Sequence, residues 1–341
     1  MANKLLVIGS ASIHTYNFIE LLREGFDEVA LVTSSEGKET NYPSFRLDFS
    51  FGLGLLRTVL QLKKIGKTFR PSVVHVHQSN NYALAAVLAF HAAGVPIILT
   101  AWGSDVLINP YRNRFFGWMI PFILRRVDAV TADSDHVLSE ATRLAGKKLE
   151  MHNINFGIDI DPCTLTKEPI VYSNRLHKEL YNIDKILVSF AAFHQNRPEW
   201  KLIVAGSGGE TEALRELARK LGIDHCTDFI GFVDAATNRE CYCRSRIYVS
   251  VPQSDSISLS LVEAIAYGCI PFVSDLPANR ELITDGVNGF IEKEPEHIDF
   301  TKFATIDTAF LTEERERLIR NFSKDVNRQR YLDLYERYIA P

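Results

Sequence analysis

The residues best suited to chemistry lie between Pro252 and Gly268, where a serine-rich loop runs into a helical pattern. The apolar run 247–251 predicts a strand before the loop, so a helix begins where that strand ends. Free backbone N–H groups at such a helix start bind phosphate, and the helix dipole favours negative charge there. Asp255 in the loop and Glu263 inside the helix add two carboxylates, which pair well with the neighbouring hydroxyls of a ribose or a hexose.

The same segment has a purely structural interpretation. Serine is a common N-cap, and a glutamate inside a helix is often solvated. On spacing alone the two interpretations carry equal weight, because short motifs often arise by chance.

The elements around this segment alternate between apolar runs and helical patterns along the whole chain. In the first half we expect strands over residues 5–8, 29–33, 73–77, 97–100, 129–132 and 151–154. In the second half we expect them over 170–174, 201–205, 228–233, 247–251 and 270–274. The alternation predicts an α/β protein with two Rossmann-like, doubly wound parallel sheets facing a cleft.

The composition limits the function classes. The chain has 341 residues, 46% hydrophobic and 23% charged, which suits two domains with packed cores. A formal charge of -4 argues against a nucleic-acid-binding protein. The first residues do not form a signal-peptide pattern, so we expect a cytoplasmic location. The irregular spacing of the cysteines predicts reduced thiols at Cys163, Cys226, Cys241, Cys243 and Cys269.

Taken with its surroundings, the 252–268 segment resembles the acidic-x7-acidic motif of the retaining GT-B glycosyltransferases of family 4, the glycosyl transferases group 1. Other segments resemble that family in the right order: 74–77, 102–105, 156–159, 201–209, 229–233, 279–283 and 286–290. The resemblance covers almost the whole chain and implies the GT-B fold. It implies an acceptor-side domain over 1–163, a nucleotide-sugar-binding domain over 164–320, and a final helix in 321–341 that crosses back to the first domain.

The resemblance also assigns residues on the donor side. Glu263 would hold the ribose, and Asp255, where the family more often has Glu, would face hydroxyls of the transferred sugar. Arg175 matches the arginine that clamps the donor pyrophosphate, a role suited to a permanently charged bidentate group. The other expected donor-binding residues are Gly206, Phe232, Ser256, Ser258, Leu259 and Ser260.

Two departures from the family pattern leave alternatives open. The family follows its arginine with a lysine about five residues later, and here either Lys178 supplies that charge or Tyr181 replaces it by hydrogen bonding. The family often has histidine where this chain has Trp102. The hydrogen bond from that histidine to the donor sugar is therefore missing here, and His77 or His14 could supply it. Either histidine is equally well read as structural. On the acceptor side we expect Gly9, His14, Trp102 and Asp105.

The function implied by the resemblance is transfer of a hexose-type sugar from a UDP- or GDP-sugar to an acceptor hydroxyl, with retention. The expected pathway is surface polysaccharide or lipopolysaccharide assembly, with a saccharide or lipid-linked saccharide as acceptor. The alternatives are a non-catalytic nucleotide-sugar-binding partner subunit and a GT-B-type sugar-nucleotide epimerase. We expect no cofactor and no essential metal. Asp133-x-Asp135 and Asp159-x-Asp161 have the spacing of a metal-binding DxD pair, which often arises by chance, and we interpret Asp133 and Asp135 as cap or turn residues.

Two stretches of the first half carry bases without acids, at 57–70 and at 109–126. The second is also rich in aromatic and aliphatic residues. One interpretation is a buried helix with basic ends. The other is a helix lying on an anionic membrane, at which the protein would be peripheral on the cytoplasmic face.

Overall fold

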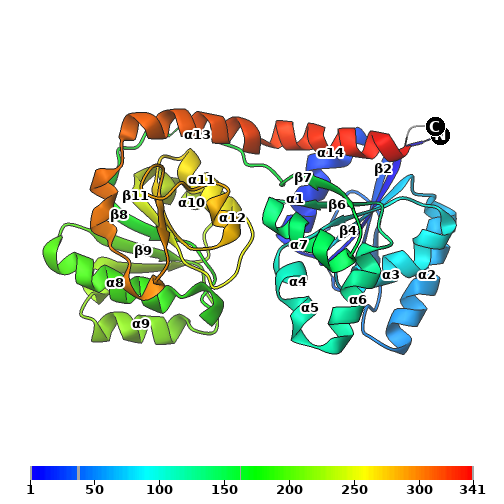
Figure 1. Cartoon of the computed structure of the whole chain (residues 1–341), viewed down its shortest axis with the longest axis horizontal. Coiled ribbons are helices and arrows are strands. Elements are labelled where there is room, and N and C mark those ends of the chain that lie inside the picture. Colours follow the sequence, from blue (N-terminus) through cyan, green and yellow to red (C-terminus); the bar gives the residue numbers. More distant parts are fainter. Residues whose placement is uncertain (1, 37–38, 162, 340–341) are drawn as a thin grey trace. The chain divides into compact units, whose positions relative to one another are not determined.

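The computed structural model describes residues 2–36, 39–161 and 163–339. It divides into two compact units (Figure 1). One unit contains the chain up to Gly157 together with the residues from Lys324 on, and the other is Ile158–Ser323. The expected boundaries at 163 and 320 therefore lie a few residues from the observed ones. Residues 1, 37, 38, 162, 340 and 341 of the expected segments lie outside the described residues.

The first unit is built on a seven-stranded, wholly parallel sheet of order β3-β2-β1-β4-β5-β6-β7. Its strands are β1 (Lys4–Ile8), β2 (Glu28–Thr33), β3 (Ser44–Arg46), β4 (Val73–His77), β5 (Ile97–Thr100), β6 (Ala129–Ala132) and β7 (Glu150–Asn153). Alternate residues of β1 belong to opposite cores: Leu6 and Ile8 pack into one, and Leu5 and Val7 into the other. Burial on both faces explains why the inner strands of this sheet, such as β1, are continuous apolar runs.

Helices cover both faces of this sheet. They are α1 (Ile13–Leu22), α2 (Leu53–Phe69), α3 (Asn81–Phe90), α4 (Ser104–Leu107), α5 (Asn109–Arg112), α6 (Arg114–Leu124), α7 (Asp135–Ala145) and α14 (Lys324–Ile339). The stretch 109–126 is thus broken rather than one helix. The break falls at Asn113, whose extended backbone ends α5 and whose side chain accepts from the N–H of Phe116 to cap α6.

The last helix, α14, is anchored in the first unit by buried polar contacts. The Tyr335 hydroxyl lies 2.6 Å from Nδ1 of His75, and Nε2 of the same ring lies 2.7 Å from the Thr100 hydroxyl. Tyr331 donates to the carbonyl of Ile154. Since these side chains are buried, each contact satisfies a polar group that would otherwise be costly to bury.

The second unit has a six-stranded parallel sheet of order β10-β9-β8-β11-β12-β13. Its strands are β8 (Glu168–Ser173), β9 (Lys201–Ala205), β10 (Thr227–Gly231), β11 (Ser245–Ser250), β12 (Ile270–Ser274) and β13 (Phe290–Glu292). Its helices are α8 (Ile183–Asn196), α9 (Thr211–Lys220), α10 (Ala235–Arg244), α11 (Leu259–Ala266), α12 (Pro277–Arg280) and α13 (Thr308–Phe322). With two such units, the predicted α/β class and GT-B fold are confirmed.

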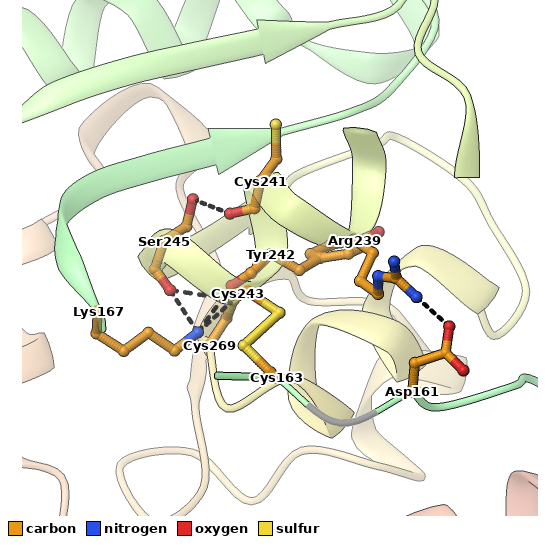
Figure 2. Close-up of a disulfide and its surroundings, with 9 residues drawn as sticks. All are labelled: Asp161, Cys163, Lys167, Arg239, Cys241, Tyr242, Cys243, Ser245 and Cys269. Atoms are coloured by element: carbon orange, nitrogen blue, oxygen red, sulfur yellow. Dashed lines mark hydrogen bonds and ion pairs between the residues drawn. A yellow bond between two sulfur atoms is a disulfide. The ribbon is translucent and has the colours of Figure 1, made fainter. Parts of the chain in front are cut away.

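The cysteines correct one expectation. Cys163 and Cys243 form a disulfide, with Cα atoms 5.9 Å apart, whereas all five cysteines were expected as thiols (Figure 2). The chain just before β8 folds back onto α10, and a separation of 80 residues along the chain hides that approach from the sequence. Figure 2 also shows Lys167 donating to the carbonyls of Tyr242 and Ser245 beside the disulfide.

No helix within residues 2–36, 39–161 and 163–339 is both long and apolar enough to cross a membrane.

Removing the Tyr335 hydroxyl tests the anchoring of α14. We expect Tyr335→Phe to destabilise the first unit by about 1–3 kcal/mol, because the buried His75 ring loses a hydrogen-bond partner. Tyr338→Phe, on the same helix, removes a hydroxyl that bonds at the exposed surface and is the matched control. Urea unfolding followed by tryptophan fluorescence measures both. Equal losses in the two variants would contradict a special role for the His75 contact.

Candidate active site

Arg175 lies in the loop after β8, at the carboxyl edge of the second sheet. Its guanidinium donates to a carboxylate oxygen of Asp255 at 2.5 Å and to the hydroxyl of Ser258. The Tyr181 ring lies beneath it, with Cζ of the arginine 4.6 Å from the ring centroid. Burial lowers the pKa of Arg175, but Asp255 together with the Tyr248 and Tyr181 side chains outweighs burial, and the pKa is raised. A permanent positive charge is therefore held at this edge.

The loop from Asp255 to Ser258 leads directly into α11. Asp255 also accepts from the N–H of Ser256, which is itself buried. Ser258 is the N-cap of α11, yet its side chain makes no capping hydrogen bond and instead accepts from Arg175. The first N–H groups of α11 and the arginine thus lie together, as the sequence interpretation of a phosphate site requires.

A glycine loop packs against the arginine loop. Gly206 follows β9 with φ +102°, and a Cβ there would stand 2.5 Å from the carbonyl oxygen of Arg175. A Cβ on Gly208 would meet the carbonyl of His177. Only glycine therefore allows the two loops this close. The sequence analysis did not predict His177, which lies between these two loops. Its Nδ1 lies 2.9 Å from Thr211 Oγ1, and its Nε2 is buried without a partner among the described residues.

Glu263 lies one turn inside α11, where an amide network holds it. Asn238 donates to its carboxylate at 3.3 Å, and Asn238 in turn accepts from Tyr172 at 2.6 Å and from Asn174 at 3.0 Å. The sequence analysis identified Glu263 but not this support, because Asn238 is 25 residues away and sits on α10. The carboxylate is therefore oriented by groups from three elements.

The remaining donor-side predictions lie around the same edge. Lys178 is exposed and makes no side-chain hydrogen bond or ion pair with any residue that the structure describes. Tyr181, the alternative that would replace the lysine by hydrogen bonding, contacts the Arg175 guanidinium with the face of its ring. Phe232 follows β10 and is 73% exposed, and Leu259 and Ser260 are half-buried at the start of α11.

The first unit has a cluster of its own at the carboxyl end of β4. His77 is buried, and its Nδ1 lies 3.2 Å from the Thr15 hydroxyl. The Trp102 ring lies 5.4 Å from the His77 ring and 5.5 Å from the His14 ring, centroid to centroid. His77 Nε2 and Trp102 Nε1 are buried without a partner among the described residues. Gln78 next to them has φ +70°, a conformation that is uncommon outside glycine and that clusters at functional sites.

Gly9 and Asp105 were also predicted on the acceptor side, and the structure places them differently. Gly9 follows β1, where a Cβ would stand 3.2 Å from Cβ of His77. Asp105 is 2% exposed, and its carboxylate accepts from the N–H of Ser79 at 2.6 Å and of Trp102 at 2.9 Å. These two hydrogen bonds hold the Trp102 loop in place. Asp135, expected as a cap, is the first residue of α7, and the cap is Ser134.

Comparison with known proteins identifies the family. Residues 163–325 match the family Glycosyl transferases group 1, and residues 4–134 match Glycosyl transferase 4-like. The chain belongs to the group 1 glycosyl transferases. The predicted family is thereby confirmed, and Arg175, Asp255, Ser258 and Glu263 all lie within the first match.

Relatives of this group 1 glycosyl transferase have different activities. Glycogen synthase of Mycobacterium tuberculosis is 26% identical over 70% of this chain and 61% of the relative. Phosphatidyl-myo-inositol mannosyltransferase of Mycolicibacterium smegmatis is 25% identical over 83% of this chain and 77% of the relative. This chain covers only 25% to 61% of the length of the first curated relatives that it matches.

The fold is also that of solved structures. Anabaena HepE in complex with UDP superposes with a TM-score of 0.80 at 14% identity, over 98% of this chain and 100% of the other. At this identity the likeness shows the common fold.

The buried His77 makes stability depend on pH. Burial, and then the nearby His14, lower the pKa of His77 to about 3, against a usual value of 6.5. Below about pH 6.5 the His77 imidazole takes up a proton in the unfolded chain but stays neutral in the folded chain. The free energy of unfolding therefore falls as the pH falls. For this group the loss is up to about 1.4 kcal/mol per pH unit.

We expect His77→Gln to flatten this dependence between pH 7 and pH 5. Urea unfolding at several pH values measures the slope, and His91→Gln, which changes an exposed histidine, is the control. Parallel slopes in wild type and His77→Gln would show that His77 does not resist protonation.

Proposed function

We propose that this protein is a retaining glycosyltransferase that moves a hexose-type sugar from a UDP- or GDP-sugar to an acceptor hydroxyl. The observation that carries the proposal is the meeting of Arg175, Asp255 and Ser258 at the start of α11. Family membership and the UDP bound by HepE, a protein of the same fold, support it.

Arg175 and the first N–H groups of α11 would stabilise the leaving group. As the bond between the sugar carbon and the phosphate oxygen breaks, negative charge grows on the nucleoside diphosphate. A guanidinium and a helix N-terminus lower the energy of that charge, most strongly where water is excluded. In the free protein Asp255 occupies the guanidinium. A bound diphosphate would compete for the arginine and release Asp255 to accept hydrogen bonds from the sugar hydroxyls.

Glu263 would accept hydrogen bonds from the ribose hydroxyls, with Asn238 keeping its carboxylate oriented. In a front-face reaction the acceptor oxygen bonds to the sugar carbon on the side from which the diphosphate leaves. The acceptor's proton passes to a donor phosphate oxygen. His77 and Trp102 would bind sugar or acceptor hydroxyls through the two buried nitrogens without partners, and neutral His77 would do so without adding charge.

The acceptor would bind in the first unit. A cavity of about 520 Å³ opens there beside the ends of β2 and β3, a size that suits a small ligand such as one sugar residue. It is lined by Ser34, Arg46, Leu47, Asp48, Phe49, Ser50, Asn81 and Tyr82. Arg46 can donate charge-assisted hydrogen bonds to a hydroxyl or a phosphate, and Asp48 can accept one from a hydroxyl.

An apolar and basic face adjoins this cavity and suggests a lipid-linked acceptor. On α2, Leu53, Leu56 and Leu60 are 62–73% exposed and share one side of the helix, opposite the buried Leu55 and Leu62. Phe51, next to the cavity-lining Ser50, packs on Phe115 of α6 with ring centroids 5.1 Å apart, and Trp118 on α6 is 58% exposed. Exposed bases surround these side chains: Arg57, Lys63, Lys64, Lys67, Arg112 and Arg114.

We therefore propose that this face lies on an anionic membrane and presents the cavity to the lipid headgroup region. The name of the mannosyltransferase relative, which acts on phosphatidyl-myo-inositol, supports a lipid acceptor. Surface polysaccharide or lipopolysaccharide assembly is the proposed pathway.

The donor site is tested first by nucleotide binding. UDP, GDP and ADP are added in turn, and thermal unfolding is followed. A nucleotide at a hundred times its dissociation constant should stabilise the protein by about 2.7 kcal/mol. We expect one base to do this, and Glu263→Ala to abolish the shift at the same concentration. Glu294→Ala, an exposed glutamate of the same unit, should bind like wild type.

Two results would count against the donor site. No shift with any nucleotide would favour the non-catalytic alternative. An unchanged shift in Glu263→Ala would mean that Glu263 does not hold the ribose. Conversion of the UDP- or GDP-sugar without any acceptor would favour the epimerase.

The membrane face is tested by co-sedimentation with vesicles. We expect binding to vesicles rich in phosphatidylglycerol, little binding to phosphatidylcholine, and release by high salt, because the attraction is partly electrostatic. Replacing Leu56, Leu60 and Trp118 together by serine should abolish binding. The matched control replaces Val188 and Val287, exposed apolar residues of the other unit. Salt-insensitive binding, or none by wild type, would overturn the proposal.

A further inference from the structure

Three side chains with metal-binding chemistry meet in the second unit, and none of them belongs to the site around Arg175. His194, His225 and Cys226 each offer one ligand atom, and these atoms all lie within 4.8 Å of one another. His194 is in the last turn of α8, and the other two are in the 3₁₀ turn Asp224–Cys226 that precedes β10. Two nitrogen donors and one sulfur donor form the kind of set that zinc prefers.

The parallel sheet places this cluster opposite the donor site. His225 and Cys226 come just before β10 begins, and Trp200, next to the cluster, comes just before β9 begins. The helix α8 follows β8 and returns, so its C-terminal end reaches the same amino edge. Arg175 lies just after the carboxyl end of β8, and α11 begins after the carboxyl end of β11. An ion bound here would therefore not touch the groups that hold the donor.

The His194 ring is already oriented as a metal ligand requires. Its Nδ1 lies 3.1 Å from the backbone carbonyl of Trp200, and a carbonyl only accepts, so Nδ1 carries the proton. Nε2 keeps its lone pair for a ligand bond. The Trp200 ring packs between Phe193 and Phe303, with centroids 5.2 Å and 4.9 Å away, and this packing fixes the carbonyl. Such a second hydrogen bond typically accompanies metal-binding histidines.

The two residues from the turn complete the set. Cys226 is buried, and its S–H donates to the carbonyl of Ile223 at 3.3 Å. Asp224 and Asp228 stand two positions before and two positions after Cys226 in the chain. Both carboxylates are exposed and would attract a cation in place of the proton. His225 is exposed, so its ring can turn towards an incoming ion, and it already lies 5.5 Å from the His194 ring.

We propose that His194, His225 and Cys226 bind one zinc ion, with water as the fourth ligand. Binding releases the thiol proton to solvent, and the ion is held by one thiolate and two neutral imidazoles. It joins the end of α8 to the turn before β10. Because the site is remote from the donor groups, the ion stabilises the second unit and takes no part in transfer.

The test uses the full chain without an affinity tag, titrated with Co²⁺ and then with Zn²⁺. We expect one Co²⁺ per chain with the near-ultraviolet charge-transfer band of a cobalt–thiolate bond, and displacement of that band by Zn²⁺. Zn²⁺ should also raise the unfolding temperature. Cys226→Ser should lose the band. His225→Ala, at an exposed position, should weaken Zn²⁺ binding by about tenfold or more.

Two controls match these variants. Cys241→Ser changes another buried thiol of the same unit, and His297→Ala changes another exposed histidine. Both should bind like wild type. Absence of the thiolate band in wild type would overturn the proposal, as would an unchanged band in Cys226→Ser or unchanged Zn²⁺ affinity in His225→Ala.

Discussion

Every strand in both sheets runs parallel to its neighbours, and the arrangement of the functional residues depends on this constraint. A parallel strand must be followed by a crossover, here mostly helical, that returns the chain to the opposite edge. All carboxyl ends of one sheet therefore meet at a single edge. Arg175, Gly206, Phe232 and Asp255 follow four different strands, yet they come to the same edge for this reason. The His194, His225 and Cys226 cluster gathers at the other edge by the same rule.

Electrostatics decides what the edge around Arg175 can bind. The Arg175 side chain is only 11% exposed, and burying a lone guanidinium would be costly. Asp255, itself 25% exposed, supplies the compensating charge, while Tyr181 and Ser258 complete the surroundings. A ligand that carries negative charge can take the place of Asp255 without leaving the arginine unpaired. The ion pair thus keeps the arginine in position for an anionic ligand.

The two histidines of β4 differ in how many of their ring nitrogens have a hydrogen-bond partner. His75 and His77 lie two residues apart and so point to the same face of the sheet. His75 is in contact on both nitrogens, with Tyr335 and with Thr100. His77, at the carboxyl end of the strand, contacts Thr15 through one nitrogen and has no described partner on the other. His75 fastens α14, and His77 keeps one buried nitrogen without a partner among the described residues.

The sequence by itself determined the alternation of elements and the motif from 252 to 268, because both depend on local pattern. Buried parallel strands are apolar on both faces, so runs such as 201–205 are visible without a structure. The three-residue edge strands β3 and β13 were not predicted, since each pairs with one neighbour only and carries little pattern.

Contacts between residues far apart in the chain were decided by the tertiary structure alone. The disulfide from Cys163 to Cys243, the support of Glu263 by Asn238, and the use of Asp105 to hold a loop all have this origin. The type of a residue tells whether its side chain can donate or accept a hydrogen bond or bind a metal. Only packing decides which partner is within reach, because a hydrogen bond or a ligand bond requires its two atoms at a fixed distance and direction.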